Sequence, residues 1–424
     1  MQIRLMKEIS LLPKNLKLFM LAILMTNIGN GMHTIAVSKL LYDKTHSAMS
    51  FGGVILIEYV VSFFIQFVSG SLVDRNNPKR ISIICDVVRG IQVLSIGILL
   101  GFTGTSVYYL FITLLIVNMV TPFYRSAIFS LIPALSKESS SLLSVNSMIY
   151  TLFQAGQLLG VALVAPIVFL LNPSIALIID GTTFLLSAAL VAFIKITKLE
   201  IKTDNTKNIK SLISDWKEVL NVMKTEKSFT GHVLVSSADY VCVSLVNLML
   251  VPMVTIWYSN NSYLISVFDG GFAIGAMLSV LFTVALSKRI GSLNCSWVGL
   301  ICQGILFILI MVNRFPLITF ILMVGIGAFN AFSISIFQTS LQERCNGPIK
   351  GRVSALRQFI VSCFSVVLIP IISYFHDISL ALGMTISGVI VIVFGVASFL
   401  LGRSYMFGEN YLSKPIFSNN NITS

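Results

Sequence analysis

The apolar residues of this chain are gathered into long blocks, most of about 20 residues or more with few charges. A helix of about 20 apolar residues, rising 1.5 Å per residue, crosses the roughly 30 Å of hydrocarbon in a bilayer. Charged residues make up 11% of the chain, whereas soluble domains carry about a quarter. The sequence therefore predicts an all-α polytopic membrane protein, whose first partner is the lipid bilayer.

Twelve transmembrane helices are expected from these blocks. We place them at 17–42, 49–73, 81–102, 106–133, 143–171, 174–196, 229–258, 263–287, 293–313, 316–341, 352–375 and 378–402. This pattern predicts an N-terminal six-helix bundle at 1–196, a cytoplasmic connection at 197–228, a C-terminal six-helix bundle at 229–402 and a cytoplasmic tail at 403–424.

The connection carries its own pattern. From Ile209 onward its apolar residues recur at helical spacing, with charges on the other face. They are Leu212, Ile213, Trp216, Val219, Leu220 and Met223. We expect an amphipathic helix on the cytoplasmic membrane surface. It serves as a strap that joins the two halves, or alternatively as a regulatory binding element.

The basic residues fall in alternate loops, and the net charge is +12. The basic set comprises Arg4, Lys7, Lys14, Lys17, Arg75, Lys79, Arg80, Arg89, eight residues between Lys195 and Lys227, Lys288, Arg289, Arg344, Lys350, Arg352, Arg357, Arg403 and Lys414. The opposite loops hold only Lys39, Lys44 and Arg314. By the positive-inside rule both termini are cytoplasmic. We read the basic excess as a topology signal in the cytoplasmic membrane of a bacterium, with no nucleic-acid partner.

A weak internal match suggests a duplicated unit. "SLVDRNNPKR" at 71–80 and "ALSKRIGSLN" at 285–294 stand 214 residues apart, and Arg75 pairs with Arg289 in that register. Each segment follows the second expected helix of its half. Two six-helix parallel pseudo-repeats are a known transporter plan, with the site between them near the midplane.

The sequence offers no engine for metal, ATP or enzyme chemistry. The cysteines are scattered, with no CxxC, and are interpreted as small apolar fillers: Cys85, Cys242, Cys295, Cys302, Cys345 and Cys363. There is no P-loop, HExxH, nucleophile elbow or glycine-rich dinucleotide turn. We therefore expect no cofactor, no metal site and no enzymatic activity.

The stretch "GSLVDRNNPKR" from Gly70 to Arg80 resembles the loop signature of the major facilitator superfamily, G-x-L-x-D-R-x-G-R-K/R. The matching residues are Gly70, Leu72, Asp74, Arg75 and Arg80. Asn77 replaces the usual glycine, which we expect to be tolerated because Asn enters left-handed conformations readily. Pro78 replaces a basic residue.

The resemblance implies a gating latch built from Gly70, Asp74, Arg75, Arg80 and Arg352. Asp74 would face the start of the eleventh helix near Arg352 and hold the cytoplasmic side shut when the site opens outward. Making and breaking this contact would shift the balance between two packed states. A basic loop that only sets topology is the alternative.

Other segments narrow the resemblance to the drug/proton antiporter-type exporter branch, which includes macrolide efflux proteins. They are "ISIICDVVRG" at 81–90, "TPFYRSAIFSLIPAL" at 121–135, "LLSVNSM" at 142–148 and "LQERCNGPIKGRVSAL" at 341–356. The expected direction of transport, outward, rests on this resemblance.

Ionisable groups inside spans are costly and are therefore functional candidates. The candidates for proton coupling are Glu58, Asp239, Asp269 and His33. A carboxyl in a low-dielectric cavity binds a proton more readily, so it can carry one between compartments while substrate competes for it.

Polar residues on the first span are candidates for substrate binding, because Asn27, Asn30 and His33 share one helical face. Arg125 either pairs with a buried acid or binds an anionic substrate. Asp180 matches an acid common in the exporter branch, and we expect it to make a structural hydrogen bond between helices. Lys39 lies near the outer edge and can snorkel.

These features predict a monomeric secondary transporter that exports a small organic molecule in exchange for protons or sodium. The cargo is expected to be an antibiotic-like compound or an endogenous metabolite such as a siderophore. A nutrient importer of the same fold and a transport-dead membrane sensor are the alternatives.

Overall fold

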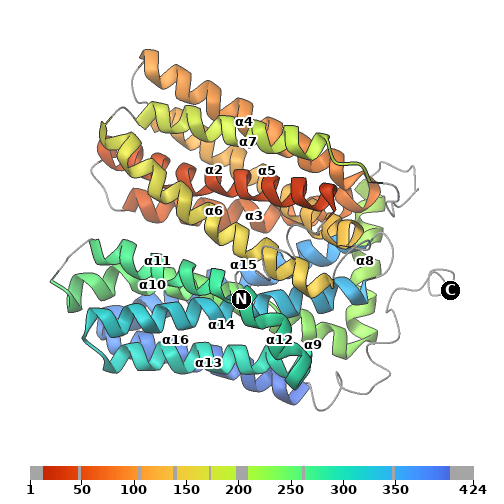
Figure 1. Ribbon diagram of the computed structural model, residues 1–424, viewed down its shortest axis with the longest axis vertical. Coiled ribbons are helices and arrows are strands. Elements are labelled where there is room, and N and C mark those ends of the chain that lie inside the picture. Colours follow the sequence, from red (N-terminus) through yellow and green to blue (C-terminus); the bar gives the residue numbers. More distant parts are fainter. Residues whose placement is uncertain are drawn as a thin grey trace. The chain divides into compact units, whose positions relative to one another are not determined.

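The computed structural model describes residues 13–45, 49–103, 107–136, 141–170, 173–196, 209–259, 263–345 and 349–401, and the regular structure within these ranges is helical (Figure 1). By length and composition, eight of the described helices can cross a membrane, or nine if one bent pair counts as a single span. The chain is therefore a multi-pass helical protein, and the expected count of twelve spans stays a prediction.

Helix bounds follow the apolar blocks closely. In the first half they are α2 (Lys14–Thr45), α3 (Met49–Arg75), α4 (Pro78–Thr103), α5 (Val107–Ser136), α6 (Leu142–Leu170) and α7 (Pro173–Ala192). The second half has α9 (Lys227–Val235), α10 (Ala238–Trp257), α11 (Tyr263–Leu278), α12 (Val280–Ile290), α13 (Ser292–Val312), α14 (Pro316–Arg344), α15 (Lys350–Ile378) and α16 (Leu380–Leu401). A further helix, α8 (Ile209–Thr225), occupies the connection. Its placement on a membrane surface stays a prediction.

The helices form two compact units. The first holds 1–145, 152–212 and 347–355, and the second holds 146–151, 213–346 and 356–424. Two helices thus change units along their length. The start of α15 belongs to the first unit, and a short segment of α6, 146–151, belongs to the second.

Two ranges that the sequence predicts to be single helices, 229–258 and 263–287, each contain a break. α9 ends before Ser236–Ser237 and α10 begins after them, while α11 and α12 meet at Ser279 with a bend of 52°. At both breaks a serine hydroxyl donates to a backbone carbonyl: Ser236 to Val233 at 2.8 Å, and Ser279 to Ala276 at 2.8 Å. Such bonds compete with the helix ladder and bend helices.

The two units repeat a close helix contact. In the first unit α4 packs along α7, and in the second α13 packs along α16 (Figure 1). A Cβ at Gly181 would lie 2.8 Å from the Gly90 carbonyl oxygen, and one at Gly304 would lie 2.6 Å from that of Gly388. Gly90 and Gly304 stand 214 residues apart, as do Gly181 and the α16 residue Gly395. The repeat offset therefore relates glycines that let backbones approach.

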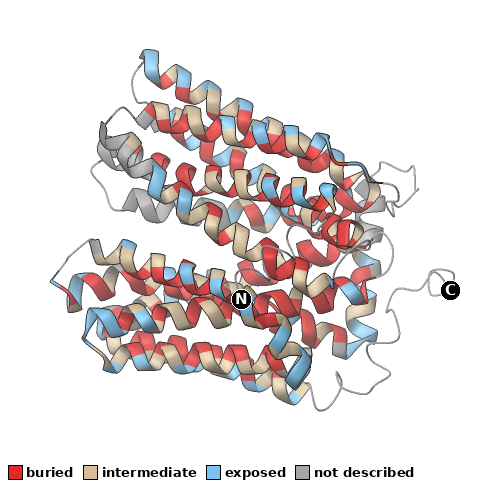
Figure 2. Cartoon of the chain, viewed as in Figure 1, coloured by how far each residue is buried: buried red, intermediate tan, exposed pale blue. Residues whose placement is uncertain are grey.

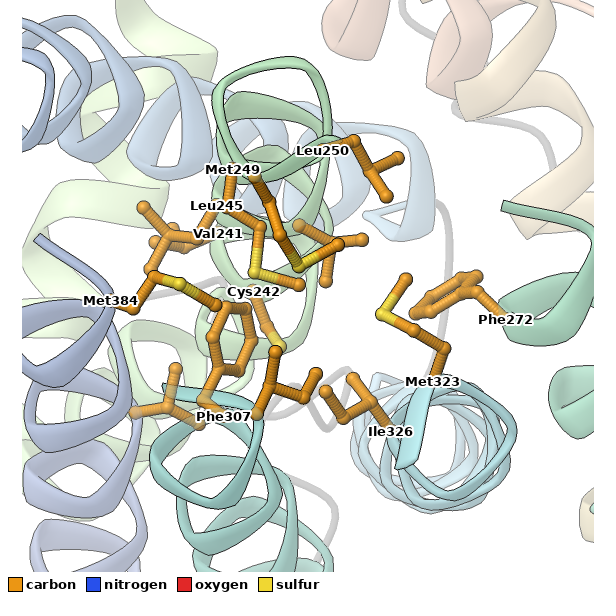
Figure 3. Close-up of a cluster of buried hydrophobic side chains, with 14 of the residues drawn as sticks. Val241, Cys242, Leu245, Met249, Leu250, Phe272, Phe307, Met323, Ile326 and Met384 are labelled. Atoms are coloured by element: carbon orange, nitrogen blue, oxygen red, sulfur yellow. The ribbon is translucent and has the colours of Figure 1, made fainter. Parts of the chain in front are cut away.

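Each unit has its own apolar core (Figure 2). In the first, α2, α4, α5 and α7 contribute residues such as Met32, Val93 and Phe184. In the second, Figure 3 shows methionines, Phe272 and Phe307 meeting from α10, α11, α13, α14 and α16. Many large apolar side chains on the outer faces are exposed, as lipid-facing surfaces require.

Candidate functional sites

The carboxylate of Asp74, at the end of α3, is held by the first turn of α15. It accepts hydrogen bonds from the backbone amides of Gly351 at 2.7 Å and Arg352 at 3.1 Å, and from Arg352 Nε at 2.9 Å. All three residues lie in the first unit, and the Asp74 and Arg352 side chains are buried. A carboxylate at a helix N-terminus that also pairs with a guanidinium combines two favourable interactions.

Gly70 makes this contact possible. A Cβ at Gly70 would lie 2.8 Å from the Cα of Arg352, and one at Gly351 would lie 2.7 Å from the Gly70 carbonyl oxygen. Two glycines therefore allow α3 and α15 to approach closely enough for Asp74 to reach the α15 amides.

The loop after Asp74 differs from expectation at Asn77. Among the described non-glycine residues, Ser259 alone has a positive φ, so Asn77 does not take a left-handed conformation. Its side-chain oxygen instead accepts from the backbone amide of Lys79 at 2.9 Å and caps the start of α4. The substitution of glycine by Asn is thus explained by helix capping.

The basic residues of the loop have separate surroundings. Lys79 Nζ donates to the carbonyls of Ala192 at 2.9 Å and Ile194 at 2.7 Å, at the C-terminal end of α7. Arg75 is half-buried, and Arg80 is exposed. Arg80 lines a cavity of about 420 Å³ together with Asn77, Lys79, Ile83, Ile194, Lys195 and Ile196.

Asp239 is a fully buried carboxylate in the first turn of α10, directly after the break. Its Oδ1 accepts a hydrogen bond from Gln303 Nε2 at 3.1 Å. Its Oδ2 has no hydrogen-bond partner among the described residues. Removing an ionised carboxylate from water is costly unless a cation pairs with it.

The cation near Asp239 is engaged elsewhere. Arg357, on α15, donates through Nε at 3.0 Å and Nη2 at 2.7 Å to the carbonyl of Ser236, which the helix break leaves available. Its guanidinium also lies over the ring of Tyr240, 4.8 Å from the centroid. Arg357 therefore acts on Asp239 through its field.

Two buried amides complete the surroundings of Asp239. Gln303, on α13, also donates to Ser333 Oγ at 3.1 Å, and Asn330, on α14, donates to the backbone carbonyl of Asp239 at 2.9 Å. Tyr150, on α6, donates to Asn330 Oδ1 at 3.1 Å. Our sequence reasoning overlooked these amides because it considered ionisable groups alone.

The first unit holds a buried charge pair that was also overlooked. Asp86 and Arg89, both on α4 and both without exposure, form an ion pair. Ser187 Oγ donates to Asp86 Oδ2 at 2.7 Å, and Thr26 Oγ1 lies 3.2 Å from the same oxygen. We call Thr26, Asp86, Arg89 and Ser187 the Asp86 cluster. Opposite charges three residues apart inside an expected span were the signal that could have found it.

Aromatic rings enclose the Arg89 guanidinium. Its Cζ lies 4.3 Å from the ring centroid of Tyr124 and 4.7 Å from that of Phe184. Cation–π attraction and the Asp86 carboxylate thus compensate a charge that no water reaches.

The loop assignment of several basic residues is wrong. Arg89 lies inside α4 rather than in the loop before it, and Arg357 lies inside α15. Both are buried, as is Arg344 near the end of α14. Counting charge along a sequence does not register burial, so these residues entered the topology count although they serve the interior.

The polar face of α2 is used within the first unit. His33 Nδ1 lies 2.9 Å from Asp180 Oδ2 on α7. Asn27 Nδ2 donates to the Ile23 carbonyl at 2.7 Å, and Asn30 Nδ2 lies 3.3 Å from Asn27 Oδ1. Asn27 also packs on α6, because a Cβ at Gly156 would lie 2.8 Å from its Cβ. The roles in substrate binding and coupling stay predictions.

The remaining candidates stand apart. Arg125, on α5, is exposed, and Asp269, on α11, is half-buried. The side chains of Glu58 and Lys39 lie outside the described residues. In the described part of the chain, no group of three or more His, Cys, Asp or Glu side chains could hold a metal ion.

Solved structures with the same fold are all distant in sequence. A bacterial homologue of the iron transporter ferroportin, in an outward-facing state, matches with a TM-score of 0.71 and 14% identity, covering 92% of this chain and 100% of its own. A variant of the E. coli fucose:proton symporter FucP matches with a TM-score of 0.70 and 12% identity, covering 91% and 98%. The human organic anion transporter MFSD10 (TETRAN) matches with a TM-score of 0.68 and 14% identity, covering 91% and 100%.

No curated protein sequence matches the chain significantly. The family model of the Major Facilitator Superfamily, in contrast, matches residues 19–370, most of the chain. The helical fold, the close structural neighbours and this match agree, and the chain belongs to the Major Facilitator Superfamily of membrane transporters.

Proposed function

We propose that this secondary transporter exports a small organic molecule across the cytoplasmic membrane of a bacterium in exchange for protons, and that Asp239 is the coupling carboxylate. The observation that carries the proposal is the environment of Asp239: full burial, one oxygen bound by an amide, and the other without a partner. A buried acid that lacks a paired cation gains most from taking up a proton when water is excluded.

The contact of Asp74 with Arg352 supports the gating part of the proposal. It joins the end of α3 to the first turn of α15, a helix whose later residues belong to the other unit. A contact that ties this turn to the first unit can bias an equilibrium between two packed states. Glu58, Asp269 and His33 remain further coupling candidates, with sodium as the alternative ion.

An importer is the second transport function, because one structural neighbour is a fucose:proton symporter. The antibiotic-like compound and the endogenous metabolite, such as a siderophore, remain the cargo classes proposed for export. Arg125, exposed on α5, is the cation proposed to bind an anionic cargo. We propose that the protein acts as a monomer with both termini cytoplasmic.

Untargeted mass spectrometry of cells and spent medium, with and without the gene and with ample or scarce iron, tests the proposal. An exporter predicts one compound that disappears from the medium and accumulates in the cells. Loss of uptake of a medium component identifies an importer instead. Unchanged profiles in both compartments remove endogenous export and leave drug efflux to be tested with added compounds.

The variant D239N then tests the coupling residue. We expect the compound to be retained in cells that express D239N at the wild-type level in the membrane. E226Q is the matched control, since Glu226 is an exposed carboxyl in the same unit and the same change to an amide leaves Asp239 untouched. Normal export by D239N would contradict the role of Asp239, and a sensor would keep its output in D239N.

A further inference from the structure

The hydrogen bonds from Asp239 to α6 run in one fixed direction. Asn330 Nδ2 donates both to the backbone carbonyl of Asp239, at 2.9 Å, and to Gln303 Oε1, at 3.0 Å. A backbone carbonyl can only accept a hydrogen bond. The orientation of the Asn330 amide is therefore set by the main chain.

The Gln303 amide is oriented by the same logic. Its Nε2 donates to the carbonyl of Gly299 at 3.2 Å and to Asp239 Oδ1 at 3.1 Å. Its oxygen is then the acceptor for Asn330. Neither amide can turn over without breaking a bond to a backbone carbonyl.

Tyr150 closes the series. Because the nitrogen of Asn330 is committed to donors' work on α10 and α13, its Oδ1 must accept, and the Tyr150 hydroxyl donates to it at 3.1 Å. We call Tyr150, Asn330, Gln303 and Asp239 the relay. Every member of the relay donates toward Asp239, and the carboxylate oxygen Oδ1 is the last acceptor.

This direction decides where a proton or donor group can bind. Asp239 Oδ1 faces a donor, Gln303 Nε2, so an added hydrogen there would meet another hydrogen. The free atom is Oδ2, which has no partner among the described residues. When Asp239 is ionised, the bond from Gln303 is charge-assisted, and bonds to ionised groups are about twice as strong as neutral ones. Chained hydrogen bonds polarise one another.

We propose that Gln303 and Asn330 are positioning residues that transmit the charge of Asp239 to α6 through the Tyr150 hydroxyl. This inference rests on the proposed coupling role of Asp239. The other titratable or charged groups around the site are Arg357 on α15 and Tyr240 and Cys242 on α10. From α13 and α14, the relay receives amides and the Ser333 hydroxyl.

The segment 146–151 of α6 is also fixed independently. Asn146 Nδ2 donates to Thr339 Oγ1 at 2.9 Å and to Gln342 Oε1 at 2.7 Å, both on α14. Loss of the Tyr150 hydroxyl therefore leaves the segment attached. What we expect it to remove is the response of the segment to Asp239.

Hydrogen–deuterium exchange of the full chain in lipid nanodiscs tests this without knowledge of the substrate. Peptides covering 146–151 are compared in mildly acidic and mildly alkaline buffer, after correction for the intrinsic exchange rate. In the wild type we expect about fivefold faster exchange in acid, because the charge-assisted bond is lost when Asp239 takes a proton. In Y150F and in Q303L we expect this difference to vanish.

Y258F is the matched control. Tyr258 lies just after α10, and its hydroxyl hydrogen-bonds Thr319 at 2.7 Å, away from the relay. The control removes the same kind of buried bond, and its exchange in 146–151 should keep the wild-type pH difference. A merely structural role of Tyr150 would speed exchange equally at both pH values.

The outcomes separate the two proposals. The relay is overturned if Y150F keeps the wild-type pH difference, or if the wild type has none. In D239N, we expect acid-like exchange of 146–151 at both pH values. If D239N keeps the wild-type difference, Asp239 is not its source, and the coupling role of Asp239 fails together with the relay.

Discussion

The two units each bury an aspartate completely, but they surround it differently. Asp86 in the first unit has a cation, Arg89, and hydroxyl donors on two other helices. Asp239 in the second unit has one amide donor, Gln303, and an oxygen with no partner among the described residues. The first arrangement compensates a permanent charge, and the second leaves room for a proton.

The difference is concentrated at one position of the repeat. Arg89 and Gln303 stand 214 residues apart, the same offset that relates Gly90 to Gly304 on the same pair of helices. A cation in one unit thus corresponds to an amide in the other. Two copies of one helical plan can therefore serve as a fixed ionic core and as a site whose charge can change.

Breaking the ion pair should have the largest effect. R89M leaves Asp86 buried without its cation, which costs about 3–5 kcal/mol of stability. We expect a much lower unfolding temperature in detergent, followed by tryptophan fluorescence. R289M, which changes an exposed arginine on α12, should shift stability by no more than about 0.5 kcal/mol. Equal unfolding temperatures for R89M and the wild type would show that the Asp86 cluster is not a stabilising pair.

Removing the amide from the second site should cost less. Q303L leaves Asp239 Oδ1 without its donor and Asn330 Nδ2 without one acceptor, at about 2 kcal/mol in all. The same measurement applies, with Q92L as the control. Gln92, on α4, is half-buried and donates to Thr113 at 3.0 Å, so its loss should cost about 1 kcal/mol or less. If Q92L proves the more harmful, the amides around Asp239 carry no special load.

The helix positions were largely predictable from the sequence, because the length and polarity of a membrane-crossing helix are set by the bilayer. The breaks at Ser236–Ser237 and at Ser279 were not. Neither contains proline or glycine, and Pro252 lies within α10 without ending it. The break at Ser236 depends on a bond from Arg357, more than a hundred residues away.

The sites were less predictable than the helices. Asp239 was found because a lone acid in an apolar run is conspicuous, whereas Gln303 and Asn330 look like ordinary polar residues of a span. Arg89 was misplaced because a sequence does not show that Asp86 neutralises it. Burial and pairing depend on neighbours from other helices, which local patterns do not encode.

Where the units agree, a matched change should affect both. G181A and G395A each add a methyl group at a helix contact, and we expect a loss of about 1–3 kcal/mol for each. The loss should be larger for G181A, because its Cβ would lie 2.7 Å from the backbone nitrogen of Leu94, against 3.1 Å between G395A and the nitrogen of Ile301.

The control for these variants is G101A, since a Cβ at Gly101 meets nothing within 4 Å. Alanine favours the helix by about 1 kcal/mol over glycine, so G101A should be neutral or stabilising. Stable G181A and unstable G395A, or the reverse, would show that the repeated glycines do not serve the same contact.

The smallest effect on stability should come from D239N. Asparagine keeps an oxygen for Gln303 and breaks no ion pair, so we expect a change of about 1 kcal/mol or less. D86N, the same substitution in the first unit, leaves Arg89 buried without a counter-charge and should cost about 3 kcal/mol or more. Side-by-side thermal unfolding of the two variants measures the contrast directly. Comparable losses would mean that Asp239, like Asp86, is held as a permanent charge, and a carboxylate of that kind could not exchange its proton during transport.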